Sequence, residues 1–540
     1  MKKIIKVLFL YFFFVLNQGY SQSWQWADHL GSSYNQYSER GLITTDGSNV
    51  YMIGSYSGTL DLGFDTIYGG GGNDIMMAKF DGSGNGIWAK TLGSGNNLPY
   101  EWEDANGIYD PIGNCLYVAG NFYQTINFGS NLSLTSIGGS DVFLAKFNLN
   151  GNCIWAKRAG GIADDNARLY VSPNGLPYLV AETKDSANFG SLSLPSGGCI
   201  AKYDTSGNCL WASYKYNLVD SNSLKLGFIN DDLLLYGSFR SALFILDTAS
   251  IQNFGDQDIF VARADSNANV KWIKHYGESG WDVVNNLAID GNNNIYSLIS
   301  FQNIITIDGN HLTSSGNGDM VWLKFDQNGI LTSYKQISSN GYVYPICTKC
   351  DNDGNLYVSG FLNGNVNFDS FSINSSNPYE LFLTRFDADG NILGLKNIAN
   401  AQPTSIEIDN FGNVFCAGGF QNIVTIGLNT FSSLGSWDIF IAKTGSITGI
   451  VGEGRITKNK LVIYANPNKG TFNIKVPDEI KSFKQAWLYV YDVSGKEIAR
   501  FNLDNESDTP HFDISNSNPG SYSVKLVQGE KVYSGKMVVE

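Results

Sequence analysis

Two segments of this sequence place carboxylates next to large aromatic side chains, a combination that suits the binding of sugars or cations. The first segment contains Tyr100, Glu101, Trp102, Glu103 and Asp104, and the second contains Trp281 and Asp282. An indole offers an apolar face for stacking, and carboxylates beside it accept hydrogen bonds from hydroxyl groups. We predict a ligand-binding site at these residues. The alternative is that each Trp folds back onto its own sheet and the acids are merely solvated.

The same carboxylates raise the question of catalysis. A glycan-active hydrolase or lyase needs two carboxyl groups at a defined separation with different pKa values. The sequence contains neither a G-x-S-x-G nor an H-E-x-x-H motif, and its four His residues lie in unrelated positions. We therefore assign no catalytic residue and favour a non-catalytic binding module. A hydrolase or lyase that uses carboxylates on one face remains the alternative.

The Cys and Asp residues offer little for metal binding. Cys347 and Cys350 have the spacing of a zinc or redox pair, but no second Cys pair or His cluster accompanies them. Turns such as residues 81–85 resemble fragments of calcium loops without the full set of ligands. We assign no metal and no cofactor, Ca²⁺ being the one ion that these turns suggest. Seven Cys is an odd number, so at least one is unpaired, and we predict buried free thiols.

A repeated hairpin must position these candidate residues. Residues 141–157 (DVFLAKFNLNGNCIWAK) are typical of a strand, a tight Asn-Gly turn and a second strand that opens on Trp155. The basic residue that ends the first of these strands recurs about every 60 residues, the spacing of a repeat protein. It stands at Lys79, Lys146, Lys202, Arg263, Lys324, Arg385 and Lys443.

A second hairpin precedes the first in each unit. Its signature is an acidic or amide residue, a Gly-Asn turn, and then an aromatic and a small residue, as in residues 351–360 (DNDGNLYVSG). Two hairpins make four antiparallel strands per unit, which is the size of one propeller blade. Apolar residues on both faces of the strands require cover above and below, and sheets packed face to face supply it.

The two ends of the repeat predict how it closes. Residues 26–31 match the fourth strand 88–93 but precede every other strand, and the last unit ends at its third strand, at Lys443. We predict an all-β fold, a seven-bladed β-propeller closed by the N-terminal strand and followed by a small C-terminal β-sandwich. Its hairpin pattern and period resemble the bacterial repeat family named for seven-bladed β-propellers. That resemblance implies a fold rather than an activity.

Charge and the N-terminal segment predict the compartment. The 540-residue chain has a formal net charge of −14 and no tract rich in Lys and Arg, which argues against nucleic-acid binding. Residues 1–21 have a basic start, a short apolar stretch and small residues at the end, as a secretory signal peptide does. No later segment is apolar enough to span a membrane. We predict a protein that is exported through the periplasm and is not an integral membrane protein.

The C-terminal region has a different pattern, with short strands in which apolar residues alternate. Three motifs stand out, residues 463–472 (IYANPNKGTF), 490–496 (VYDVSGK) and 519–525 (PGSYSVK). They resemble the type A C-terminal sorting domain of the type IX secretion system. The matching positions are Asn466, Pro467, Gly470, Asp492, Gly495, Gly520 and Tyr522. The resemblance implies that secretion machinery in the outer membrane recognises this domain.

Together these patterns predict a signal peptide at 1–21, a propeller at 22–445, a linker at 446–459 and a sorting domain at 460–540. The predicted function is that of type IX secretion cargo, sent to the cell surface or the medium. The propeller is expected to be a binding or adhesion module, with a glycan or another cell-surface component as its partner.

Overall fold

The elements of the described part of the chain are all β-strands, which confirms the all-β prediction. The computed structural model describes residues 24–31, 40–93, 103–129, 131–216, 224–351, 353–369, 371–445, 447, 449–452, 461–464, 467–475, 486–491, 497–503, 511–528 and 531–539. Among these residues there is no helix with the length and hydrophobicity of a membrane span.

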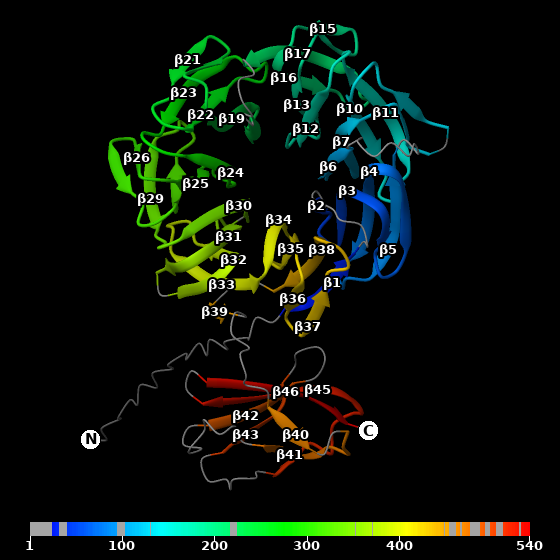
Figure 1. Ribbon diagram of the computed structural model, residues 1–540, viewed down its shortest axis with the longest axis vertical. Coiled ribbons are helices and arrows are strands. Elements are labelled where there is room, and N and C mark those ends of the chain that lie inside the picture. The colour runs from blue at the N-terminus through cyan, green and yellow to red at the C-terminus, as the bar shows by residue number, and fades with distance from the viewer. Residues whose placement is uncertain are drawn as a thin grey trace, which may run out of the picture.

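Four-stranded antiparallel sheets follow one another around a ring (Figure 1). In chain order, the first sheet contains β2 (Arg40–Thr45), β3 (Asn49–Asp61), β4 (Thr66–Asp81) and β5 (Gly86–Leu92), and the next contains β6 (Asp104–Asp110), β7 (Cys115–Phe122), β10 (Asp141–Phe147) and β11 (Cys153–Gly160). Then follow β12 (Asp165–Val171), β13 (Pro177–Thr183), β16 (Gly197–Tyr203) and β17 (Cys209–Tyr216); β18 (Lys225–Ile229), β19 (Asp232–Phe239), β22 (Asp258–Ala264) and β23 (Val270–Tyr276); and β24 (Val283–Ile289), β25 (Ile295–Phe301), β28 (Asp319–Phe325) and β29 (Leu331–Ile337). The last two sheets contain β30 (Tyr342–Cys350), β31 (Leu356–Phe368), β32 (Phe371–Phe386) and β33 (Ile392–Ala399), and β34 (Ala401–Ile408), β35 (Val414–Phe420), β38 (Asp438–Thr444) and β1 (Trp24–Leu30). The first strand of each set lies nearest the centre of the ring.

The strand at the start of the described chain belongs to the sheet formed by the end of the repeat. β1 pairs antiparallel with β38, with Ala27 opposite Ala442 and Leu30 opposite Ile439. The indole N–H of Trp26 also donates to the backbone oxygen of Gly82, at 3.1 Å, in the turn between β4 and β5. The predicted pairing of these two segments is therefore observed.

The hydrophobic cores lie between neighbouring sheets. One cluster packs Ile53 and Met77 of β3 and β4 against Phe143 of β10. Another packs Met52 of β3 against Ile441 of β38. Full burial of one such side chain contributes about 1.5–3 kcal/mol, so every sheet depends on both of its neighbours.

The recurring basic residue lies in a row of side chains that crosses each sheet. Lys146 of β10 is opposite Tyr117 of β7 on one side and Trp155 of β11 on the other. Its Nζ lies 5.3 Å from the centre of the Tyr117 ring, a cation–π contact. The indole N–H of Trp155 donates at 3.2 Å to the oxygen of Thr205, in the next sheet along the chain. The repeated residues therefore hold sheets together.

Each sheet also carries a feature that the sequence reading did not anticipate, an outer extension of the hairpin between its second and third strands. In several sheets this extension is a separate two-stranded ribbon, namely β8 (Thr125–Asn127) with β9 (Ser133–Thr135), β14 (Ala187–Phe189) with β15 (Leu192–Leu194), β20 (Leu243–Leu246) with β21 (Ala249–Gln252), β26 (Ile304–Ile307) with β27 (Asn310–Thr313), and β36 (Ile423–Ile426) with β37 (Asn429–Ser432). The ribbons reach the preceding sheet, since β14 pairs with β11 and β20 pairs with β17. They thereby cover outer edges that would otherwise expose unpaired backbone groups.

The C-terminal strands form two sheets with a core between them. One sheet consists of β40 (Val462–Tyr464), β41 (Thr471–Lys475) and β44 (His511–Asp513), and the other of β42 (Ala486–Tyr491), β43 (Glu497–Asn502), β45 (Gly520–Gln528) and β46 (Lys531–Val539). Phe472, Val490 and Leu526 are buried in their shared core. This is the sandwich arrangement that the alternating pattern predicted.

Part of the segment that was predicted to be a linker forms a strand. β39 (Gly449–Gly452) pairs in parallel with β33, with Gly394 opposite Gly449. The pairing gives the exposed edge of β33 a partner. The strand was missed because four residues rich in Gly carry no recognisable strand period.

Candidate functional site

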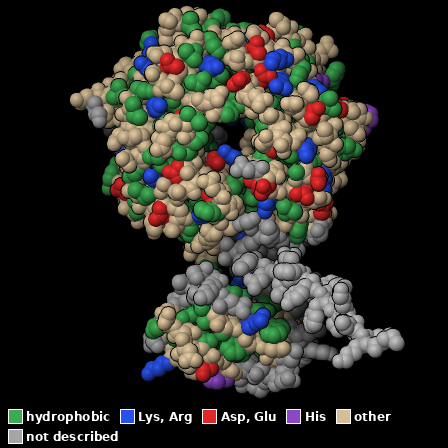
Figure 2. Space-filling model, turned by 180° about the vertical axis from the view of Figure 1, so that it is seen from behind, with side chains coloured by type: hydrophobic (Ala, Val, Ile, Leu, Met, Phe, Trp, Pro, Cys, Tyr) green, Lys and Arg blue, Asp and Glu red, His purple; other side chains and the backbone are tan. Residues whose placement is uncertain are grey.

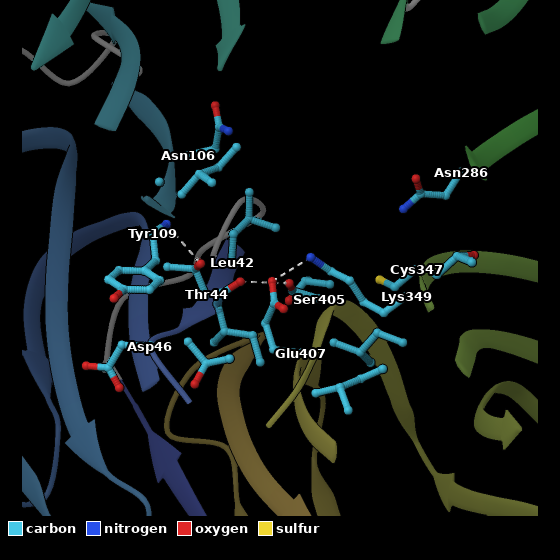
Figure 3. Close-up of a pocket in the computed structure, with 18 of the residues that line it drawn as sticks. Leu42, Thr44, Asp46, Asn106, Tyr109, Asn286, Cys347, Lys349, Ser405 and Glu407 are labelled. Atoms are coloured by element: carbon cyan, nitrogen blue, oxygen red, sulfur yellow. Dashed lines mark hydrogen bonds and ion pairs between the residues drawn. The ribbon is translucent and has the colours of Figure 1, made fainter. Parts of the chain in front are cut away.

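A cavity of about 650 Å³ lies between the innermost strands. Residues of β2, β6, β30 and β34 line it, together with Asn286 of β24 (Figure 3). A second cavity of about 350 Å³ shares Ile108, Tyr109 and Pro111 with the first and continues toward β12 and β18. Figure 2 shows a hollow at the centre of the ring, with basic and acidic side chains at its margin. A concave space of this size is where ligands most often bind.

The cavity lies toward the opposite face from the one that the sequence reading favoured. Its lining includes Asp46, Pro111 and Asn410, in the turns that follow the innermost strands β2, β6 and β34. The predicted site residues instead stand at the beginnings of innermost strands, since Asp104 opens β6 and Asp282 directly precedes β24. Equivalent strands run in the same direction in every sheet, so these are opposite ends.

Several polar side chains of the cavity wall already have backbone partners. Asn106 accepts from Leu169 N and donates to Leu169 O in the neighbouring sheet, both at 3.1 Å. Thr44 accepts from Tyr109 N at 3.1 Å, and Thr404 donates to Gly41 O at 2.6 Å. One edge of each innermost strand has backbone N–H and C=O groups without a neighbouring strand, and these hydrogen bonds give some of those groups a partner. They therefore join adjacent sheets.

Lys349 and Glu407 face each other across the cavity wall. Lys349 Nζ lies 2.7 Å from Glu407 Oε1, joining β30 to β34 (Figure 3). Burial raises the pKa of the Glu407 carboxyl, and the positive charge of Lys349 opposes that shift. The pair is therefore a fixed ionic contact.

Lys225 of β18 does not line the cavity, but it contacts a residue next to the cavity wall. Its Nζ donates to the backbone oxygen of Asn285, next to the lining residue Asn286. Burial, and then the nearby positive charge of Arg168 on β12, lower the pKa of Lys225 to about 8. Sequence reasoning missed Lys225, because nothing in a single strand shows that its ammonium will reach the backbone of another sheet.

Trp281 is partly buried against the next sheet in the structure. Its indole N–H donates to Gln257 Oε1 at 2.7 Å. Its ring meets the ring of Tyr344 edge to face, with centroids 5.5 Å apart. Both partners belong to neighbouring sheets, whereas the alternative placed each Trp on its own sheet, and the role of Trp281 in ligand binding stays a prediction.

Asp282 is fully buried, with a relative exposure of 0%. Burial, and then the negative charge of Asp258, raise the pKa of Asp282 to about 8, and backbone N–H groups of Glu278 and Gln302 oppose the shift. Asp165 occupies the matching place in another sheet, and burial raises its pKa to about 6. Carboxyls this deep in the protein cannot reach a polymer in solvent.

The other predicted segment is described only at its end. Glu103 is buried and Asp104 is exposed at the start of β6. Tyr100, Glu101 and Trp102 lie outside the described residues. The predicted site at Tyr100–Asp104 and Trp281–Asp282 therefore stays a prediction.

The sequence analysis did not single out another group of buried acids, the Asp residues that begin the third strand of a sheet. Asp141 and Asp258 begin the third strand of their sheets, and both are fully buried. Arg158 Nη1 donates to Asp141 Oδ2 at 2.6 Å, and His275 Nε2 lies 2.7 Å from Asp258 Oδ2. The same pairing recurs between Asp319 and Gln336 and between Asp438 and His29. The sequence does contain a signal for these pairs, because the residue that contacts each Asp always stands three positions after the repeated Trp position.

The Cys residues and the acids in the hairpin turns have contacts that fit a structural role. All seven Cys are free, four of them buried and three partly buried, and burial raises the pKa values of Cys347 and Cys350 to about 12. In the turn of residues 81–85, Asp81 accepts hydrogen bonds from the backbone of Ser83 and Asn85. Its carboxylate is thus used to cap a hairpin. Within the described part of the chain, no three His, Cys, Asp or Glu side chains are grouped so as to hold a metal ion.

The described motif residues of the C-terminal region shape turns and fill its core. Gly470 has a φ of 92° before β41, and its N–H donates to Asn468 Oδ1 at 2.7 Å. Tyr522 is buried in the core, and its hydroxyl donates to Asn518 O at 2.5 Å. Pro467 lies in the turn before β41 and Gly520 opens β45, whereas Asn466, Asp492 and Gly495 lie outside the described residues.

Comparison with known families identifies this region. Residues 462–540 match the model of the secretion system C-terminal sorting domain. The C-terminal sandwich is a secretion sorting domain. The match confirms the prediction of a type IX sorting domain and makes the chain cargo of that system, directed to the cell surface or the medium. It also implies contact between the sorting domain and the secretion machinery.

Similarity beyond the sorting domain is low. Regulatory protein FlaEY of Caulobacter vibrioides is 25% identical over 217 residues, which are 37% of this chain and 22% of that protein. The chain therefore spans only a small part of this relative's length. A duf4221 family member from Bacteroides vulgatus has 12% identity and a TM-score of 0.31, over 62% of this chain and 90% of that one.

Two enzyme structures are similarly distant. A puromycin hydrolase mutant has 9% identity and a TM-score of 0.34, over 71% of this chain and 59% of that one. A mutant of the Synechocystis apocarotenoid oxygenase has 12% identity and a TM-score of 0.30, over 77% of this chain and 96% of that one. Likenesses this weak carry no argument about activity.

Proposed function

We propose that this chain is secretion cargo whose ring of sheets is a non-catalytic binding or adhesion module at the cell surface or in the medium. The observation that carries the proposal is an open cavity of about 650 Å³ in a chain that ends in a sorting domain. A glycan or another cell-surface component is the proposed partner. Export begins with the proposed signal peptide at 1–21.

The proposed architecture is a seven-bladed β-propeller at 22–445, closed by its N-terminal strand, with a linker at 446–459 and the sorting domain at 460–540. Each sheet of the ring is one proposed blade. The pairing of β1 with β38 supports the closure. So does the hydrophobic cluster that packs Met52 and Phe80 of the first sheet against Ile439 and Ile441 of the last.

The burial of the loop acids favours a binding role over a hydrolase or lyase. Two described loop acids with strongly raised pKa values, Asp165 and Asp282, are buried, with exposures of 1% and 0%. A general acid must contact the glycosidic oxygen. Of the two acids that line the cavity, Glu407 is held by Lys349 at 2.7 Å, and Asp46 accepts hydrogen bonds from the backbone of Ser48 and Asn49 in its own turn. The loop residues Tyr100–Asp104 and Trp281–Asp282 remain a second proposed contact region.

A polysaccharide panel tests the proposal. The purified full chain is passed over immobilised neutral and acidic polysaccharides, and both retention and new reducing ends are measured. A binding module is retained on at least one polymer and releases no reducing ends. New reducing ends without an unsaturated product would favour the hydrolase. New reducing ends together with an unsaturated product would favour the lyase, because elimination also frees a reducing end. Absence of retention on every glycan and on whole cells would contradict the binding role.

A further inference from the structure

Aromatic side chains form a continuous row across three neighbouring sheets, those that contain β24, β30 and β34 (Figure 1). The ring centroids of Trp281 and Tyr344 lie 5.5 Å apart, and those of Tyr344 and Phe361 lie 5.4 Å apart. Phe361 lies 5.9 Å from Tyr379, which lies 6.0 Å from Trp437. Tyr342 lies beside the row, 5.6 Å from Tyr344. We call these side chains the aromatic strip, namely Trp281, Tyr342, Tyr344, Phe361, Tyr379 and Trp437.

The strip lies on the face of the ring where the innermost strands begin. Trp281 directly precedes β24, and Tyr342 opens β30. Trp437 directly precedes β38, which runs in the same direction as the innermost strand β34 because both are antiparallel to β35. The turns that line the 650 Å³ cavity follow the innermost strands and belong to the opposite face. The strip is therefore a region separate from that cavity.

The rings of the strip are held in place and still reach solvent. Tyr379 is exposed, with a relative exposure of 37%, and the other rings are partly buried. The Trp437 ring lies over Gly419 of β35, where an added Cβ would stand 3.1 Å from Trp437 Cε3. Trp281 is fixed by its hydrogen bond to Gln257 at 2.7 Å. Rings fixed in this way lose little conformational freedom when a ligand stacks on them.

The common frame of the repeat does not require these rings. Tyr379 and Trp437 stand six residues before the repeated basic residue, where the other sheets have Asn73, Ser140, Ser196, Gln257 and Gly318. Phe361 stands four residues after the residue that pairs with that basic residue, where the other sheets have Ser55, Asn121, Glu182, Ser238, Ser300 and Gly419. Equivalent sheets thus form with small or polar side chains at these positions. The aromatic rings gather in adjacent sheets and depart from the repeat, which indicates a local role.

The charges around the strip favour a neutral ligand. Asp282, Glu380 and Asp438 each follow a ring of the strip directly in the chain, and all three are buried. The chain has a formal net charge of −14, so an acidic polymer is repelled from its surface. A neutral polymer meets no such repulsion.

Hydrogen-bonding groups accompany the rings. Gln257 Oε1 accepts from the indole of Trp281 and also, at 2.9 Å, from Nε of the exposed Arg240. The hydroxyl of Tyr342 donates to the backbone oxygen of Pro378. A sugar ring has an apolar C–H face and a rim of hydroxyl groups, so it matches aromatic rings that are bordered by polar groups.

We propose that the aromatic strip binds a neutral polysaccharide chain, whose sugar rings stack on the aromatic rings between Trp281 and Trp437. The inference rests on the proposed binding function and names its ligand class and its site. A row that crosses three sheets suits an extended chain better than a single sugar, because contacts along one chain add up once its first sugar is bound.

Calorimetry on the full chain tests the ligand class. Cellohexaose, xylohexaose and mannohexaose are titrated at one ionic strength, each beside its own disaccharide, and hexagalacturonic acid is the acidic comparison. At least one neutral hexasaccharide should bind about tenfold or more tightly than its disaccharide, because the longer chain reaches more rings. It should also bind more tightly than hexagalacturonic acid.

Variants show whether the strip makes the contact. Tyr379→Ala and Trp437→Ala should each weaken binding of that hexasaccharide about two- to tenfold, the effect of one lost stacking contact. Tyr379→Phe should bind as the wild type does, because it keeps the ring. Tyr334→Ala is the matched control, since Tyr334 of β29 has a similar exposure of 43% and lies outside the strip. Melting temperatures check folding, and Tyr379→Ala carries the test if Trp437→Ala does not fold.

The outcomes separate this inference from the proposed function. Absence of binding by every hexasaccharide, tightest binding of hexagalacturonic acid, or equal affinity of folded Tyr379→Ala and Tyr334→Ala overturns the inference. An equal loss in Tyr379→Phe and Tyr379→Ala also overturns it, because the ring then makes no stacking contact. Retention on whole cells that survives periodate oxidation of their glycans, and is lost in Tyr379→Ala, would assign the strip to a protein instead.

In each of these cases retention on another polysaccharide or on cells leaves the proposed binding module intact. Absence of retention on every glycan and on cells contradicts both.

Discussion

Asp282 and Asp81 are both loop carboxylates, but their surroundings give them opposite pKa shifts. Asp81 accepts hydrogen bonds from the side chain and backbone of Asn85, which lower its pKa. Asp282 is buried beside Asp258, so its pKa rises to about 8. At the scale of single residues, hydrogen-bond donors and burial decide what an acid can do.

The raised pKa of Asp282 predicts how stability depends on pH. The folded protein holds a proton on Asp282 that the unfolded chain releases near pH 4, so stability falls as pH rises from about 4 to about 8, by at most about 1.4 kcal/mol per pH unit. Asp282→Asn should remove this fall and raise the melting temperature at pH 8 relative to the wild type.

Thermal melts between pH 5 and pH 9 measure the effect. Asp81→Asn is the control, because the pKa of Asp81 is lowered and its contribution is lost only as pH falls through the acid range. A parallel pH dependence in wild type and Asp282→Asn would contradict the assigned shift.

Trp281 provides a second test at the residue scale. Its ring packs against Tyr344 and its indole bonds to Gln257. Trp281→Ala should therefore lower the melting temperature, at a cost of about 2–4 kcal/mol in unfolding free energy for a partly buried Trp. Trp281→Phe should lose less, since it keeps an aromatic ring and loses one hydrogen bond.

Ligand retention must be measured on the same variants. If Trp281→Ala keeps its melting temperature and loses binding, the residue belongs to a ligand site as the sequence suggested. Lower melting with unchanged binding shows a packing role.

At the scale of elements, β1 contacts both the last sheet and the first. It pairs with β38 along its length, and His29 Nε2 lies 2.8 Å from Asp438 Oδ2. Trp26 reaches Gly82 O in the first sheet at 3.1 Å. One strand thus contacts both ends of the repeat.

Deletion of residues 22–31 should destabilise the whole ring. The last sheet would lose its outer strand, and the backbone edge of β38 would be left unpaired. We expect a much lower melting temperature and a tendency to associate, measured by calorimetry and light scattering. Removing residues 449–452 is the control, because β39 adds only a short parallel strand to β33. Equal effects of the two deletions would contradict the proposed closure.

At the scale of the whole molecule, the two C-terminal sheets have their own core of Phe472, Val490 and Leu526. The clusters of the ring contain none of these residues. The ring and the sorting domain are therefore stabilised by separate sets of buried side chains.

Removing residues 460–540 should leave a folded ring that does not reach the surface. We expect the truncated protein in the periplasmic fraction, with a melting transition close to that of the ring in the full chain. Cell fractionation and protease accessibility measure its location. Trp281→Ala in the full chain is the control, since it weakens the ring without altering the sorting domain. Surface display of the truncated protein would contradict the sorting role.

Much of the architecture could be predicted from sequence because it depends on local patterns. The hairpins appeared as an Asn-Gly turn between apolar strands, and the repeated Lys and Trp marked their register. The likeness of residues 26–31 to residues 88–93 predicted that β1 pairs with β38, which is observed. The sorting domain was predicted from three short motifs and is confirmed by the family match. The outer ribbons were missed, because strands of three or four residues have too short a period to recognise.

The position of the candidate site depended on contacts that no single segment reveals. The sequence shows Asp282 only as a loop residue, but folding buries it. Trp281 looked exposed in the sequence, and in the structure its ring lies against Tyr344. The cavity is formed by innermost strands that come from sheets far apart in the chain, and Lys349 meets Glu407 only when the ring forms. Sequence determined the elements, since turns and alternation are local. Tertiary structure decided which charges are buried and which share a space, since burial and Coulomb interactions depend on distances between segments.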